Sequence, residues 1–314
     1  MDAAVAADIE RIARQVASHN GNRRDAHVKH HGLVRAEVRI LPDLPEQLRH
    51  GLFKAPATFQ AVIRFSNASH AVGADGARDN HGMAIKLFDV PGEKLLDDEH
   101  STFDLLLVDH PTFFTADPRE FADIMRRAAT ATSTLAKLAM ALHHPRAVLR
   151  IARMMQVIAS PLAATYFSMT AYRLGPQQVV KYLARPVGPS SAQMPAQPGK
   201  DYLREALACE LAEGERWFDL CVQLRSDPYT MPADDPTVEW SESDARAIPV
   251  ATIRILKPPA DASDPLQLLR AETITFNPWR VTQDHAPLGR FNLLRREIYK
   301  AIAAQRQAVL ATRP

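Results

Sequence analysis

Apolar and polar residues alternate along several short segments of the chain, which is the pattern of β-strands that bury one face. The pattern is clear in residues 33–41, where Val34, Ala36, Val38 and Ile40 share one side. Similar patterns predict strands at residues 60–66, 82–88, 103–108, 165–174, 178–183, 217–224, 248–256 and 273–276. Because the early segments are joined by short turns, we expect an antiparallel sheet.

Helical periodicity lies between and around these strands. Phe121, Ile124 and Met125 fall on one side of a predicted helix at residues 118–128. Helical patterns also cover residues 3–18, the region up to about 158, residues 202–211 and the C-terminal segment 287–306. We therefore expect an α+β protein with surrounding helices, in which residues 1–314 form a single domain and the antiparallel sheet can close into a β-barrel core.

The composition indicates a globular protein and argues against several classes. Hydrophobic residues make up 46% and charged residues 24% of the chain. The 38 basic and 36 acidic residues are too evenly balanced to predict a nucleic-acid partner. Acids stand near the N-terminus where an export signal would carry bases, and Cys209 and Cys221 lack a metal or disulfide spacing. These features predict a cytoplasmic protein with free thiols.

The most apolar region, residues 135–165, is too interrupted for a membrane-spanning helix. Lys137, Arg150, Arg153 and the basic residues at 143–146 divide it into two amphipathic helices. Such helices can pack against a core, or lie on a membrane surface or a lipid substrate, and the sequence leaves these uses open.

The C-terminal helix carries a spacing that suggests a haem site. Arg295 and Tyr299 are four residues apart and Arg306 is seven further on, so all three can lie on one helical face. Tyrosinate is one of the few side chains that ligate haem iron, and an arginine one turn away stabilises the phenolate. An arginine and a tyrosine at this spacing also form ordinary surface pairs worth about 0.2–0.5 kcal/mol, so both interpretations remain.

Histidine and arginine supply the other candidate groups. His27 can take a proton from a peroxide and return it to the departing oxygen. Its neighbours His30 and His31, with His81 and His110, lack the spacing of a zinc site. Arg24 and Arg64 can bind carboxylates such as the haem propionates through paired hydrogen bonds, although single arginines are more commonly solvated surface charges.

Several segments, in order, resemble those of the catalase superfamily of haem proteins. Arg24-Asp25-Ala26-His27-Val28-Lys29 is similar to the segment of the distal histidine, and Val62-Ile63-Arg64-Phe65-Ser66 to the VRFS strand. The turn and strand RDPRGFAVK are similar to residues 78–86, RDNHGMAIK. Further similarities are Pro111-Thr112-Phe113-Phe114 with Phe121, Ile248-Pro249-Val250, Phe276-Asn277-Pro278, and Arg295-x-x-x-Tyr299 with Arg306. Together these segments span residues 24–306.

The resemblance implies a cofactor and a role for each matched residue. The cofactor is haem, most simply of the b type, with Tyr299 as the iron ligand and Arg295 hydrogen-bonded to it. His27 would lie on the peroxide side, and Phe121 would stack on the haem. The propionates would be held by Arg24, Arg64 and Arg306. The implied partners are a small-molecule peroxide and a small reductant, and a homodimer remains open.

The chain also departs from the family pattern. Full catalases have Asn-Asn-Thr-Pro where Val108-Asp109-His110-Pro111 stands here, so the distal asparagine is missing. Asp109 is the candidate replacement, although a carboxylate accepts hydrogen bonds and donates only when protonated. Ala26 stands where allene oxide synthases have a threonine. We expect a minimal member, most similar to the small catalase-related peroxidases and the allene-oxide-synthase-like proteins, without the N-terminal arm and C-terminal domain of full catalases.

These features predict a haem-dependent peroxidase that reduces organic hydroperoxides, including those of fatty acids, with weak catalase activity. One alternative is a true minimal catalase that disproportionates hydrogen peroxide. Another is a fatty-acid hydroperoxide isomerase, which Ala26 disfavours. The last is a haem- or lipid-binding protein without catalytic turnover.

Overall fold

The computed structural model describes residues 11, 26–69, 72–130, 134–257, 270–271 and 273–311. Within this part, nine strands form one antiparallel sheet in the order β5-β4-β3-β2-β1-β9-β8-β7-β6. The strands are β1 (His30–Ile40), β2 (Thr58–Asn67), β3 (His81–Leu87), β4 (Phe103–Val108), β5 (Tyr166–Phe167), β6 (Tyr172–Leu174), β7 (Gln178–Val187), β8 (Arg216–Leu224) and β9 (Ala247–Ile255). Because β5 also pairs with β7, the sheet closes into a barrel of eight strands, and β6 pairs with the beginning of β7.

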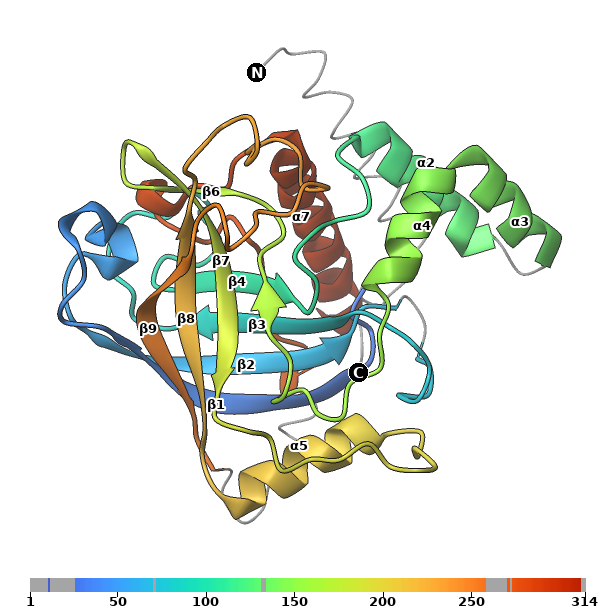
Figure 1. Cartoon of the computed structure of the whole chain (residues 1–314), viewed down its shortest axis with the longest axis horizontal. Helices are drawn as coiled ribbons and strands as arrows, with labels where there is room; N and C mark the ends of the chain where they lie inside the picture. Colours follow the sequence, from blue (N-terminus) through green and yellow to red (C-terminus); the bar gives the residue numbers. More distant parts are fainter. Residues whose placement is uncertain are drawn as a thin grey trace.

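Helices occupy three places around this barrel (Figure 1). The helices α2 (Pro118–Thr130), α3 (Thr134–His143) and α4 (Pro145–Met154) lie between β4 and β5 in sequence and project from one side. α5 (Tyr202–Glu213) joins β7 to β8, and α7 (Arg290–Ala311) ends the fold beside the barrel. Short 3-10 turns occur at Glu46–Leu48, Gly51–Phe53 and Gln283–His285. None of the helices in the described part combines the length and apolar character needed to cross a bilayer.

The predicted α+β class and the antiparallel barrel are confirmed, with two local corrections. Residues 165–174 form two short strands, because the chain leaves the ladder at Met169, which has a φ of 58°. Residues 273–276 are wrongly predicted as a strand, since the backbone N–H of Ile274 donates a helix-like hydrogen bond to Arg270 O. The helix predicted at residues 3–18 lies outside the described residues apart from Arg11.

The core fills the inside of the barrel with the inward-facing residues of the ring strands. Val38, Ile63, Ile85, Phe218 and Ile253 are all fully buried there. Successive side chains of a strand point to opposite faces, so the residues between them point outward. The outward-facing side chains of β2, β3 and β4 are therefore available to line a site outside the barrel core.

One titratable side chain lies inside this core. His285 is fully buried, its Nε2 accepts the backbone N–H of Leu52 at 2.8 Å, and its Nδ1 lies 2.7 Å from Tyr182 Oη. Burial lowers the pKa of His285 to about 3 from its ordinary value of 6.5. Between these two pH values the unfolded chain binds a proton that the folded chain does not. The free energy of unfolding should therefore fall as the pH falls from 6.5 towards 3.

We predict that His285 alone removes about 1.6 kcal/mol of stability between pH 6.5 and pH 5, because the slope rises to about 1.36 kcal/mol per pH unit as the unfolded histidine becomes protonated. Urea unfolding at both pH values would measure this loss. In the His285→Gln variant the total stability should be lower at neutral pH, but its decline with acidification should be smaller by about that amount. The exposed His143→Gln variant is the control. Equal declines for wild type and His285→Gln would contradict the prediction.

Candidate functional site

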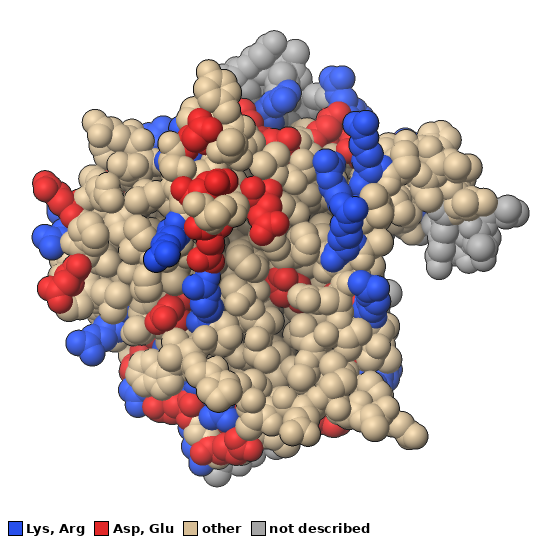
Figure 2. All heavy atoms as spheres, in the orientation of Figure 1, with Lys and Arg blue, Asp and Glu red and all other residues tan. Residues whose placement is uncertain are grey.

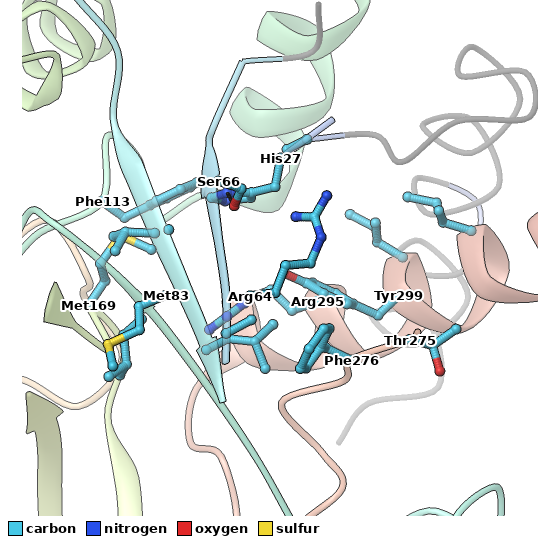
Figure 3. Close-up of a pocket in the computed structure, with 18 of the residues that line it drawn as sticks. His27, Arg64, Ser66, Met83, Phe113, Met169, Thr275, Phe276, Arg295 and Tyr299 are labelled. Carbon is cyan, nitrogen blue, oxygen red and sulfur yellow. Dashed lines mark hydrogen bonds between the residues drawn. The ribbon is translucent and has the colours of Figure 1, made fainter. Parts of the chain in front are cut away.

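A cavity of about 210 Å³ lies against the outer face of the barrel. Outward-facing residues of β2 and β3 form one side of it, including Ser66, Gly82 and Ala84. Helix α7 forms another side through Arg295, Ile298, Tyr299, Ile302 and Ala303, and α2 contributes Phe121. Figure 3 shows the strand side chains and the α7 side chains around this common space. The cavity is therefore built from segments at both ends of the described chain.

His27 enters the cavity from the segment before β1. Its φ of 60° lies in the left-handed region, and its backbone N–H donates to Ala68 O at 3.2 Å. The imidazole Nδ1 lies 3.0 Å from Ser66 Oγ (Figure 3). Gly82 lies directly beneath the ring, since a Cβ placed on this residue would come within 2.5 Å of His27 Nδ1. The absence of a side chain at Gly82 is what leaves room for the imidazole.

On the opposite side, helix α7 presents Arg295 and Tyr299 one turn apart. The guanidinium carbon of Arg295 lies 6.0 Å from the centre of the Tyr299 ring. Arg295 Nη1 donates to Thr170 Oγ1 at 3.0 Å and to Asn292 Oδ1 at 3.1 Å, which fixes the side chain. Burial alone would lower the pKa of Arg295, but its interactions with Tyr172 and Tyr299 raise it above its ordinary value. A permanent positive charge therefore stands beside the Tyr299 ring.

Arg64 brings a second cation to the cavity wall. It is only 2% exposed, and its Nε donates to Ala271 O at 3.2 Å. Such burial is uncommon for arginine, whose charge normally remains in contact with water or with an anionic partner. Its place in the lining means that an anionic group entering the cavity would meet a guanidinium already held in position.

The remaining wall is aromatic. The ring centres of Phe113 and Phe291 are 4.5 Å apart, and those of Phe121 and Phe291 are 5.5 Å apart with their planes nearly perpendicular. Phe276 adds a further ring to the lining. These contacts join the loop after β4, helix α2 and helix α7. They make the cavity a suitable place for a flat apolar group.

The structure brings most of the predicted site residues together. His27, Arg64, Phe121, Arg295 and Tyr299 all line the cavity. Two others cannot be compared with the prediction. Arg24 lies outside the described residues, and for Arg306 the structure describes the helical backbone but not the side chain.

Asp109, the candidate replacement for the distal asparagine, is not among the residues that line the cavity. It is buried and bound to another partner. One carboxylate oxygen lies 2.5 Å from His81 Nδ1 and accepts Gln156 Nε2 at 2.8 Å, while the other accepts the His81 backbone N–H at 2.7 Å. The three hydrogen bonds thus hold the Asp109 carboxylate outside the cavity lining.

Sequence reasoning missed three residues that shape the site. Ser66 and Gly82 lie within segments that resemble the family, but the sequence pattern did not predict a role for either residue. Thr170, which holds Arg295, comes from the break between β5 and β6. That break was predicted as continuous strand, so no signal in the sequence could have placed Thr170 against α7.

Comparisons with known proteins agree with this architecture. The model of the Catalase family matches residues 23–262. The chain therefore belongs to the catalase family. A bacterial catalase structure is similar with a TM-score of 0.73 and 20% identity, covering 91% of this chain and 57% of that one. A fungal catalase structure gives 0.66 and 18%, covering 90% and 59%.

The chain spans less than three fifths of the length of either catalase structure, and at this identity the likeness concerns the fold. The family match ends before α7 begins at Arg290, so it does not include Arg295 or Tyr299. No curated protein matches the sequence. The interpretation of α7 therefore depends on the geometry of the cavity.

Proposed function

We propose that this protein is a haem-dependent peroxidase that reduces organic hydroperoxides. The observation that carries the proposal is the common cavity of His27 and Tyr299, which are 272 positions apart in the sequence (299 − 27) and face the same apolar space. Family membership supports peroxide chemistry in general. The preference for organic hydroperoxides is supported by the predominantly apolar lining of the cavity as a whole.

The residues of the cavity fit a haem. Tyr299 offers an oxygen ligand for iron, with the charge of Arg295 beside it. Arg64 is suited to a carboxylate, and the three phenylalanines Phe113, Phe121 and Phe291 suit the faces of a flat ring. When bound, haem would supply the redox chemistry that cleaves the peroxide O–O bond.

His27 has the position and chemistry of a general acid and base. When its Nδ1–H donates to Ser66 Oγ, Nε2 carries the lone pair and can accept the hydroperoxide proton. The same nitrogen then returns this proton to the departing oxygen. The overall reaction takes two electrons and two protons from a small reductant, and converts ROOH to ROH and water. The apolar residues of the wall keep bulk water away from these transfers.

A minimal catalase is the second candidate, because the family match and the residues facing the cavity are compatible with it. Catalytic disproportionation needs the site to hold a second hydrogen peroxide. Among the described residues that line the cavity there is no asparagine or glutamine to help orient it. The Asp109 carboxylate is turned towards His81. These two observations favour the peroxidase.

The deciding experiment uses the protein expressed with a haem precursor. We would measure the consumption of cumene hydroperoxide and of a fatty-acid hydroperoxide with an electron donor, and oxygen evolution from hydrogen peroxide. Donor-dependent formation of the alcohols with little oxygen evolution would support the proposal. Rapid oxygen evolution would support the minimal catalase instead, and rearranged rather than reduced products would support an isomerase. Haem binding without peroxide turnover would leave a binding protein.

The state of the two cysteines supports a proposal for the cellular compartment. Cys209 is exposed and Cys221 is buried, and both are free. Free thiols of this kind suit a reducing compartment such as the cytoplasm. A small cytoplasmic reductant is therefore the electron donor that we propose.

Gly82 provides a further prediction for this site. We expect Gly82→Ala to displace the His27 ring, because the new Cβ would stand 2.5 Å from Nδ1. Peroxide turnover should fall at least about tenfold, which is part of the roughly 10²–10⁴-fold that general acid–base catalysis contributes, while haem content remains close to that of wild type. Gly199→Ala is the matched control, since its Cβ would meet nothing within 4 Å. Full turnover in Gly82→Ala would show that the position of His27 is unimportant.

A further inference from the structure

Helix α4 carries a basic stripe on its outer face. Arg146, Leu149, Arg150 and Arg153 follow one another at the spacing of a single helical face. Arg146, Leu149 and Arg153 are exposed, and Arg150 is half-buried with its Nη1 donating to Phe114 O at 3.4 Å. We call these four residues the α4 stripe.

The other side of α4 is already occupied by the fold. Ala147 and Met154 are buried, and they pack in a cluster with Val108, Ile124 and Met169. This packing fixes the helix on the body of the protein and leaves the α4 stripe directed away from it. The stripe therefore takes no part in forming this core.

Exposed leucines accompany the basic residues. Leu142 is 74% exposed and Leu138 is 55% exposed, and the two lie one turn apart on α3. Leu149 of the α4 stripe is 52% exposed. Three large apolar side chains therefore face solvent on the helical hairpin α3–α4. A single exposed leucine needs no explanation, whereas several on one projecting element indicate a binding surface.

The same part of the chain is free of acidic residues. No Asp or Glu occurs between Asp123 and Asp201, although arginines and lysines recur there. Asp123 itself is paired with Arg126, Arg127 and His144, so its charge is already compensated. In Figure 2, basic side chains form a row where α4 lies in Figure 1, and the visible face of the projecting lobe beside it carries no acidic colour.

We propose that the hairpin α3–α4 docks this protein on the surface of an anionic lipid bilayer. The arginines of the α4 stripe would bind lipid phosphates, and Leu138, Leu142 and Leu149 would enter the boundary between headgroups and acyl chains. This binding is peripheral, because neither helix is long enough to cross a bilayer. The proposal goes beyond the peroxidase function and does not depend on haem.

Other occupants explain these features less well. A symmetric contact with a second copy would bring the two sets of arginines together without an acid on α3 or α4 to compensate them. A nucleic acid would use the arginines but would gain nothing from three exposed leucines. An anionic bilayer uses both kinds of side chain.

The test is flotation of the purified protein with vesicles of phosphatidylcholine alone or with 30% phosphatidylglycerol. We expect binding to the anionic vesicles, little binding to the neutral ones, and weaker binding at high salt. Arg146→Gln with Arg153→Gln should lower the partition coefficient by about 25-fold, at roughly fivefold for each arginine. Leu142→Gln with Leu149→Gln should lower it by roughly tenfold.

Two exposed positions elsewhere serve as matched controls, Arg39→Gln on β1 and Val187→Gln at the end of β7. Both controls should bind the anionic vesicles as wild type does. Equal binding by wild type and the four hairpin substitutions would overturn the proposal. Equal binding to neutral and anionic vesicles would also overturn it. The same holds if the protein does not bind vesicles and instead forms a dimer that depends on Leu142 and Leu149. Tight binding of a DNA duplex without vesicle binding would overturn it as well.

Discussion

Replacing His27 by alanine should lower the rate of organic-hydroperoxide reduction by about 10²–10⁴-fold, the range that a general acid and base contributes. The cause is the loss of the imidazole that holds the transferred proton beside Ser66. Haem content should remain close to that of wild type, because the proposed iron ligand, Tyr299, lies on α7 on the other side of the cavity. Stopped-flow measurement of peroxide consumption and a pyridine haemochrome assay would provide the two numbers.

A second histidine provides the control for this prediction. His110 is half-buried, and its Nδ1 lies 3.1 Å from the carbonyl oxygen of Thr112 rather than in the cavity lining. His110→Ala should therefore keep most of the activity. Ser66→Ala should fall between the two, because His27 remains but loses the hydrogen bond at Nδ1. If His27→Ala turned over hydroperoxide as fast as wild type, another group would have to move the proton.

The barrel was predictable from the sequence wherever one strand face is buried and the other is not. In β1, Ala36, Val38 and Ile40 are buried and alternate with less buried residues, so the sequence itself shows the period of two that is typical of a strand. The break between β5 and β6 was not visible. There Met169 has a positive φ, and Ser168 Oγ accepts the backbone N–H of Tyr182 from the neighbouring strand β7. A contact of this kind exists only after the barrel has formed.

The residues at 273–276 were misread for a related reason. Thr273, Ile274 and Thr275 are β-branched and resemble a strand. Here Thr275 and Phe276 line the cavity instead of joining a ladder. Local propensity was overridden by the place of this segment in the cavity wall, which strand periodicity alone does not predict.

An ordered set of motifs names several residues that line the cavity, but it does not predict the orientation of Asp109, which depends on His81 of the neighbouring strand β3. The segment similar to RDPRGFAVK has His81 in the position of the second arginine, and Asp109 stands in the position of the asparagine. These two residues pair directly, with 2.5 Å between His81 Nδ1 and the Asp109 carboxylate. Seen separately, Asp109 seemed to replace a cavity residue. Seen together, the pair explains why the carboxylate turns away.

Replacing Tyr299 by phenylalanine should remove the proposed iron ligand and change the absorption spectrum of the haem-loaded protein. We expect the ferric spectrum of wild type to be lost or altered, and the dissociation constant for haem to rise by about tenfold or more, since the ring packing remains and the oxygen ligand does not. Absorption spectra and haem titration of the apoprotein would measure both effects.

Tyr172→Phe is the matched control for this last prediction, because Tyr172 also interacts with Arg295 but does not line the cavity. If neither tyrosine bound the iron and each affected the haem only through its contact with Arg295, Tyr299→Phe and Tyr172→Phe would change the spectrum to a similar, small extent. If Tyr299 is the ligand, only Tyr299→Phe should abolish the wild-type spectrum, and Tyr172→Phe should retain it. A Tyr299→Phe protein with an unchanged spectrum would mean that haem is held by another residue. A wild-type protein that folds but takes up no haem would mean that the family's barrel has been kept for binding of another kind.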